Sequence, residues 1–82
     1  MAATRTRPTP AKREFDKAYG AAHVASLRAW DASEASSRYA PGLHRAAYDA
    51  NIHAAKIADK CGYAEIAVAR REAAQRHLEE LR

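Results

Sequence analysis

Metal binding and nucleophilic catalysis are the two kinds of chemistry for which this sequence supplies side chains. It holds four histidines and one cysteine: His23, His44, His53, His77 and Cys61. No two of the histidines are three or four residues apart, the spacing that places two ligands on one face of a helix. If the chain reverses at Pro41, His23 comes level with Asp59 and close to Cys61, the single three-ligand cluster that the spacing allows. A helix-to-helix ion pair or a solvated histidine explains the same residues, and we expect no metal and no cofactor.

The other three histidines are tested by the geometry of a second reversal, at Gly62. Two antiparallel helices joined there place His53 opposite Arg71. The same geometry places His77 opposite Ala47. It also puts His44 near Glu80. Hairpin geometry therefore pairs none of these histidines with another.

Nucleophilic catalysis has no stronger support. Cys61 falls at the predicted C-terminus of a helix, where the negative end of the helix dipole disfavours a thiolate. The serines have no histidine at hydrogen-bonding spacing, and the three glycines are isolated rather than gathered in a phosphate-binding loop. We expect no enzymatic activity and no small-molecule substrate.

Alanine determines the architecture that positions these side chains. Twenty-two of the 82 residues are alanine, the strongest helix former, and most recur at helical spacing in three runs. Thr9 followed by Pro10 is typical of a helix start, and Gly62 is typical of a helix end. The connections are short, which makes consecutive helices antiparallel. The sequence predicts an all-α, up-down-up three-helix bundle with helices over residues 10–39, 43–61 and 63–81.

The prediction leaves one alternative open in the first helix, and it expects no helix at the N-terminus. Gly20 weakens the first helix, and Asp31-x-x-Glu34 would suit the start of a separate short helix. We favour one continuous helix, and a break there would give a four-helix variant. Residues 1–9 are expected to form a disordered basic tail, because they are polar and have no apolar period. Residues 10–82 are expected to form a single helical domain.

Composition and charge limit the class of protein. Large apolar residues are few, but a net charge of only +4 and the abundance of alanine favour an ordered bundle with a thin core. One cysteine forms no internal disulfide. There is no apolar run of about 18 residues and no apolar signal segment at the N-terminus. We expect a cytoplasmic protein that makes no membrane contact.

Each predicted helix carries a second apolar strip beside its main alanine face. On the first helix Val24 and Leu27 lie opposite the main face, and on the second Tyr48 and Ile52 lie to one side. A partner surface and a merely exposed pair explain Val24 and Leu27 equally well. The second strips suit a bundle in which every helix has two neighbours, and they also suit a unit that completes its burial against a partner or a second copy.

Two polar residues of the third helix project into its apolar side. Arg70 and His77 are seven residues apart, and we favour their placement at the edge of the core with wet polar heads over a polar spot in an interface. The candidate interface residues are Val24, Leu27, Trp30, Tyr48, Ile52 and Arg70.

The basic residues near the N-terminus suggest an alternative function. No acidic residue accompanies them before Glu14, and beyond that point ten basic residues balance ten acidic ones. Such a segment would neutralise a few phosphates and bind nucleic acid weakly and with strong salt dependence. A solubilising tail explains it too, and we favour that explanation. The candidate nucleic-acid-binding residues are Arg5, Arg7, Lys12 and Arg13.

The C-terminal half carries a pattern of small residues around a glycine turn. It reads Ala54-x-x-x-Ala58, then Cys61-Gly62-Tyr63-x-Glu65, then Ala67 and Ala73-Ala74. On these residues, positions 43–82 resemble one helical hairpin of the tetratricopeptide-repeat family, without that family's Trp-Leu-Gly opening or closing proline. The resemblance implies helical-hairpin packing and not peptide binding.

The wider composition carries a second resemblance. A chain rich in Ala and Arg, with recurring Ala-x-x-x-His and His-Ala-Ala, is similar to small orphan proteins of actinobacteria and their phages. That similarity implies a regulatory, immunity or defence role exercised by binding another protein. We therefore predict a non-catalytic protein–protein interaction module that binds a partner protein or self-associates, with a nucleic-acid-associated regulator as the alternative.

Overall fold

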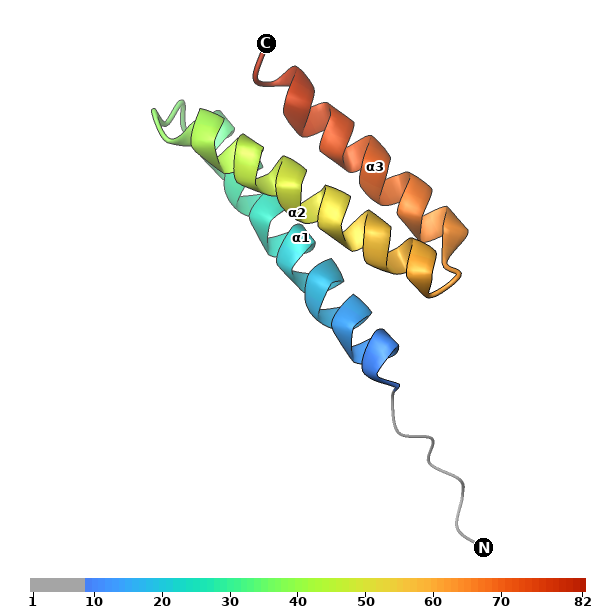
Figure 1. The fold of residues 1–82 in the computed structure, drawn as a ribbon. Coiled ribbons are helices and arrows are strands. Elements are labelled where there is room, and N and C mark those ends of the chain that lie inside the picture. Colours follow the sequence, from blue (N-terminus) through green and yellow to red (C-terminus); the bar gives the residue numbers. More distant parts are fainter. Residues whose placement is uncertain (1–8) are drawn as a thin grey trace, which may run out of the picture.

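Three helices make up the part of the chain that the structure describes. The structure is a computed structural model, and it describes residues 9–82, with α1 (Pro10–Glu34), α2 (Ala40–Lys60) and α3 (Ala64–Glu79). Figure 1 shows α2 lying between α1 and α3, with consecutive helices running in opposite directions. The predicted all-α three-helix architecture is confirmed, and α1 is unbroken, so the four-helix variant does not form. The predicted tail over residues 1–9 lies outside the described residues except for Thr9.

The start of α1 follows the predicted capping chemistry. The Thr9 side-chain oxygen accepts a hydrogen bond from the Lys12 backbone N–H at 3.1 Å, and Pro10 occupies the first helical position. A threonine at this position satisfies one of the N–H groups that a helix start leaves free, and proline has no N–H to satisfy there.

The first helix ends earlier than the sequence predicts. It stops at Glu34 rather than near Tyr39. Ser36 adopts the left-handed conformation, with φ of 52°, and the Ser37 N–H donates to the Ala32 carbonyl at 2.9 Å. Left-handed backbone cannot continue an α-helix, so the serine-rich segment forms a turn instead of a last helical turn.

The second helix begins earlier than predicted for a related reason. It starts at Ala40 rather than Leu43, and Pro41 lies in its first turn instead of ending the helix before it. A proline in the first turn breaks no helical hydrogen bond, because the N–H groups there have no partner within the helix.

The turn between α2 and α3 forms as the glycine predicts. Gly62 has φ of 79°, the Tyr63 N–H donates to the Ala58 carbonyl at 2.8 Å, and the Gly62 N–H donates to the Asp59 carbonyl at 3.1 Å. These bonds form a Schellman motif, which satisfies the last carbonyls of α2. The structure places the end of α2 at Lys60 and the bounds of α3 at Ala64 and Glu79.

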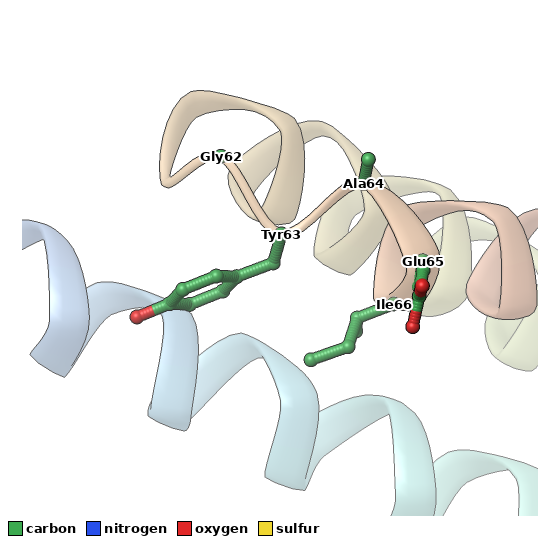
Figure 2. Close-up of a pocket in the computed structure, with 5 residues that line it drawn as sticks. All are labelled: Gly62, Tyr63, Ala64, Glu65 and Ile66. Atoms are coloured by element: carbon green, nitrogen blue, oxygen red, sulfur yellow. The ribbon is translucent and has the colours of Figure 1, made fainter.

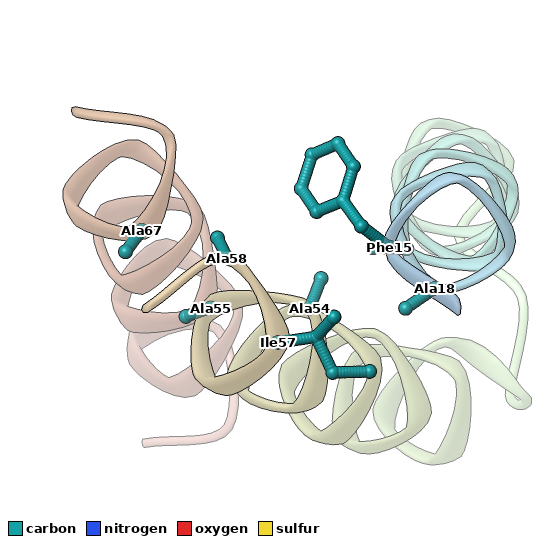
Figure 3. Packing of buried hydrophobic residues seen from close by; sticks show 8 residues of the cluster. Phe15, Ala18, Ala54, Ala55, Ile57, Ala58 and Ala67 are labelled. Carbon is teal, nitrogen blue, oxygen red and sulfur yellow. The ribbon is translucent and has the colours of Figure 1, made fainter. Parts of the chain in front are cut away.

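Alanine lines the contacts between the helices, and large apolar side chains are few among them. Phe15 and Ile57 are the two large members of the buried apolar set, and the other nine members are alanines. Figure 3 shows Phe15 of α1 pointing into the space above Ala54 and Ala58 of α2. Because alanine is small, α1 and α3 each pack closely on α2, while their own backbones approach each other at few points. Longer side chains therefore fill the space between α1 and α3.

None of the helices within residues 9–82 is long and apolar enough to cross a membrane.

Candidate functional site

The largest fully buried side chains among residues 9–82 are polar. His44, Asn51 and His77 are each at most 2% exposed, and they are larger than the alanines around them. Burying a polar group without a hydrogen bond costs on the order of several kcal/mol, so such groups are held by specific partners. These three residues define the centre of the candidate site.

The two histidines form a direct pair between α2 and α3. His44 lies in the first turns of α2 and His77 in the last turn of α3, and the antiparallel arrangement brings these two ends together. Their Nδ1 atoms are 2.8 Å apart. The indole of Trp30, from α1, packs on both rings with centroid distances of 4.8 Å and is stacked on His77 at 29°. We call Trp30, His44 and His77 the histidine cluster.

Two serines of α1 complete the hydrogen bonds of the imidazoles. Ser33 Oγ lies 2.6 Å from His44 Nε2, and Ser26 Oγ lies 2.9 Å from His77 Nε2. All four ring nitrogens therefore have partners. The pair ties together all three helices, because each imidazole bonds to the other and to α1.

Asn51 extends this arrangement along the interior. Its Nδ2 donates to Ser26 Oγ at 3.0 Å and to the Ala47 carbonyl at 2.8 Å. Its Oδ1 accepts from Arg70 Nη1 at 3.2 Å. One continuous hydrogen-bond chain thus runs through Arg70, Asn51, Ser26, His77, His44 and Ser33.

The partners restrict the direction of this hydrogen-bond chain. Both amide protons of Asn51 are engaged, and one of them occupies a lone pair of Ser26. The Ser26 hydroxyl keeps one proton and a second lone pair, so it can donate to His77 Nε2 or accept from it. Between the rings one Nδ1 donates and the other accepts, so a single proton lies between them.

The surroundings of His77 favour its neutral form. Burial lowers the pKa of His77 below its ordinary value, and the neighbouring His44 lowers it further. The carboxylate of Glu80 opposes both effects by raising it. The largest cause is burial, because desolvation penalises the charged imidazolium.

The order Ser26, His77, His44 has the connectivity of a nucleophile, a base and an orienting group. Catalysis also requires that a substrate reach the hydroxyl and that donors face a developing negative charge. Here the base is 1% exposed, and the hydroxyl oxygen accepts a bond from Asn51 inside the protein. We interpret the hydrogen-bond chain as a packing element that orders the helices.

A pocket of about 420 Å³ lies away from the histidine cluster, around the α2–α3 turn. Figure 2 shows Tyr63 and Ile66 pointing toward α1, while Ala64 lies on the opposite side. The turn is roughly 20 Å along α3 from His77. The pocket therefore does not open onto the histidine cluster. Its lining residues are Gly62, Tyr63, Ala64, Glu65 and Ile66.

The three-ligand cluster that the sequence allows does not assemble. Asp59 forms an ion pair with Arg71 of α3, and Cys61 Sγ contacts the Ala11 carbonyl at 3.6 Å. Ala11 is about three helical turns, or roughly 18 Å, from His23 along α1. Within residues 9–82 there is no group of three or more His, Cys, Asp or Glu side chains placed to hold a metal ion.

The predicted interface residues fall into two groups. Val24 and Leu27 are 46% and 51% exposed on α1. The other four are partly buried, and Trp30 packs inside the histidine cluster rather than on the surface. Tyr48 lies under the guanidinium of Arg45, which is 6.0 Å from the ring centroid.

The side chain of Arg70 is held in place by its neighbours but forms no ion pair within residues 9–82. Besides its bond to Asn51, its guanidinium lies 5.2 Å from the centroid of the Tyr19 ring on α1. Its Nε is buried and makes no hydrogen bond. Within residues 9–82 no carboxylate forms an ion pair with it. The arginine is held between α1 and α3 without a counterion.

The predicted nucleic-acid-binding residues are only partly described. Arg5 and Arg7 lie outside the described residues. Lys12 donates to Asp16 at 2.7 Å, and this bond raises the pKa of Lys12. Arg13 is exposed in the first turns of α1. Of the four candidates, Lys12 therefore has an acidic partner within its own helix.

Hairpin reasoning from the sequence missed the histidine pair by about one helical turn. It placed His77 opposite Ala47 and His44 near Glu80, and it left His77 at the wet edge of the core. The placement of His77 at a wet edge is wrong, because its ring is buried and fully hydrogen-bonded. A signal was present in the apolar side on which His77 falls, but nothing in the spacing singled out Ser26, Ser33 or Asn51.

Comparison with protein-family models, with curated proteins and with solved structures finds no match for this chain.

Proposed function

We propose that the protein is a small non-catalytic protein–protein interaction module whose contact surface is centred on Arg70 and extends over the exposed side of α1. The observation that carries the proposal is the half-buried guanidinium of Arg70, which is held by Asn51 and Tyr19 and lacks an ion-pair partner within residues 9–82. Arginine is enriched at interface hot spots, where it is held in place before the partner arrives.

The chemistry of Arg70 specifies the group that it would bind. A half-buried guanidinium that forms no ion pair within residues 9–82 matches a carboxylate of the partner in charge and in hydrogen-bond donors. Val24 and Leu27 are exposed on α1, and apolar side chains of the partner would cover them. The partner surface therefore carries an acidic residue beside apolar ones.

A second copy of the chain is the partner that we propose first. The thin alanine core leaves little apolar burial within one copy, and self-association would add to it. The exposed carboxylates Glu72 and Glu79 on α3 form no ion pair within residues 9–82, so a second copy offers the required acidic group. A regulatory, immunity or defence role exercised by such binding is the biological setting that we propose.

Sedimentation equilibrium of the full chain tests this function. We expect a dimer at tens of micromolar protein, and we expect Arg70→Gln to raise the dimer dissociation constant by about tenfold or more, as loss of a hot spot does. Arg76→Gln, an exposed arginine of the same helix, is the matched control and should leave the constant unchanged within about twofold. A monomer at millimolar protein would exclude self-association, and equal dimerisation of the Arg70→Gln variant would exclude Arg70 as the anchor.

The alternative function, salt-dependent binding to nucleic acid through the basic N-terminal residues, has a separate test. Binding of the full chain to a DNA duplex at low salt should disappear when residues 1–13 are deleted, if that segment supplies the contacts. Binding that is absent before and after the deletion removes the alternative. The Arg70→Gln variant should behave like the wild type in this assay.

A further inference from the structure

We propose that the hydrogen-bond chain through His44 and His77 is a pH-dependent latch, which holds the C-terminal half of α3 against α1 and α2 while both imidazoles are neutral and releases it when both carry an extra proton. The inference concerns the stability of the fold itself and does not depend on the proposed interaction.

The position of the pair makes α3 the part that would move. The α2–α3 turn joins α3 to α2 at one end, and His77 lies in the last turn at the other end (Figure 1). The bonds of His77 to His44 and Ser26 anchor this far end to both neighbouring helices. Release of the far end of α3 requires no other segment to become ordered, and it leaves the turn at Gly62 intact.

The geometry of the pair allows one proton between the rings and not two. The Nδ1 atoms are 2.8 Å apart, so one of them donates and the other must accept. When both imidazoles are charged, each ring carries a proton on Nδ1, and two N–H groups then face each other. The contact becomes a repulsion between two cations, which separates the rings.

The neighbouring groups offer little compensation for this charge. From α1 the pair meets the indole of Trp30 and the hydroxyls of Ser26 and Ser33, none of which carries a charge. From α2 the neutral Asn51 joins the hydrogen-bond chain at Ser26, and it links that hydrogen-bond chain to the cationic Arg70 of α3.

One carboxylate acts on the pair from α3 and the residues that follow it. Glu80 favours a charged His77, but no carboxylate hydrogen-bonds to either imidazole within residues 9–82. A positive charge on the pair would therefore lie in a nearly closed interior, and exposure to water relieves it.

Amide hydrogen exchange on the full chain, followed residue by residue between about pH 7.5 and pH 5, tests the latch. Two protons are taken up on release, so the opening constant of amides in residues 74–79 should rise by up to about a hundredfold per pH unit below the ordinary histidine pKa of about 6.5. Amides at the centres of α1 and α2 should stay better protected than those of residues 74–79 at every pH, because they exchange through global unfolding. The opening constant at each pH is the observed exchange rate divided by the intrinsic exchange rate at that pH.

Two double variants separate the latch from a general effect of histidine. His44→Phe/His77→Phe keeps aromatic rings beside Trp30 and carries no titratable group, so the pH dependence of the α3 opening should vanish. His23→Gln/His53→Gln removes the two exposed histidines and should retain it. If the phenylalanine variant does not fold, His77→Gln leaves one titratable ring, and the dependence should fall to at most about tenfold per pH unit.

Three results would overturn the proposal. The first is constant protection of α3 from pH 7.5 to pH 5 in the wild type. The second is an opening free energy that is the same for amides of all three helices at every pH, which would mean global unfolding without a latch. The third is a pH dependence that survives in His44→Phe/His77→Phe or disappears in His23→Gln/His53→Gln.

Discussion

His44 and His77 meet through the same ring atom, with Nδ1 to Nδ1 at 2.8 Å, so the proton that one ring donates fixes the tautomer of the other. Ser26 and Ser33 of α1 hydrogen-bond with the outer nitrogens. A hydrogen-bonded polar pair thus fills the interior between the first turns of α2 and the last turn of α3. Such a pair stabilises the fold only while every member keeps its partner.

Truncation of His77 should be strongly destabilising. His77→Ala removes the partner of His44 Nδ1 and the ring stacked on Trp30, and it leaves a cavity in the core. We expect the free energy of unfolding to fall by about 3 kcal/mol, since cavity and lost hydrogen bonds act together. Urea denaturation measures the change. His53→Ala, an exposed histidine of α2, should stay within about 0.5 kcal/mol of the wild type, and equal effects of the two variants would contradict the assigned role.

Removal of the Asn51 amide should disturb both of its side-chain partners, Ser26 and Arg70. Asn51→Ala takes away the donor to Ser26 and the acceptor of Arg70, which leaves Arg70 without a hydrogen-bond partner in the interior. The free energy of unfolding should fall by about 2 kcal/mol. Equilibrium denaturation followed by circular dichroism gives this value. A change below about 0.5 kcal/mol would show that Asn51 is dispensable; Asp49→Ala, at an exposed neighbouring position, is the control.

The two left-handed residues should respond in opposite ways to substitution. Gly62→Ala introduces a side chain at φ of 79° and should lower the free energy of unfolding by about 1 kcal/mol. Ser36→Gly relieves the same strain at φ of 52° and should raise it by up to about 1 kcal/mol. Thermal melts of the two variants check the signs. The same sign for both would refute the assignment of strain to these turns.

A helical glycine provides a separate stabilising prediction. Gly20 lies inside α1, and a methyl group added there meets no atom within 4 Å. Gly20→Ala should therefore raise the free energy of unfolding by about 1 kcal/mol through helix propensity alone. Thermal denaturation should show a higher midpoint. A lower midpoint would mean that the exposed side of α1 is covered in solution, as contact with a second copy would produce.

The lowered pKa of His77 sets the sign of the pH dependence of global stability. The unfolded chain has the ordinary pKa of about 6.5 and binds a proton that the folded chain resists. Stability is therefore full above about pH 6.5 and falls as the pH drops from there toward the folded pKa. Urea midpoints at pH 8, 7, 6 and 5 should decline in the wild type and decline less in His77→Phe. Parallel declines would assign the effect to other groups.

The local features of this fold were readable from short stretches of sequence. Thr9 with Pro10 predicted the start of α1, and Gly62 predicted the turn after α2, because capping is decided by a few neighbouring atoms. The end of α1 was predicted incorrectly. Pro41 is equally compatible with the end of one helix and with the first turn of the next. The left-handed backbone of Ser36 decides between the two, and this conformation is rare for a serine.

The sequence by itself determined that this protein is helical, that it has three helices and that alanine forms their contacts, because propensity and periodicity act within each helix. Only the tertiary structure decided which polar side chains meet inside. The hairpin rule locates a residue to about one turn, and one turn separates the predicted neighbour of His77, Ala47, from its observed partner His44. Hydrogen bonds require positions accurate to a few tenths of an ångström, and only the packing of all three helices supplies that accuracy.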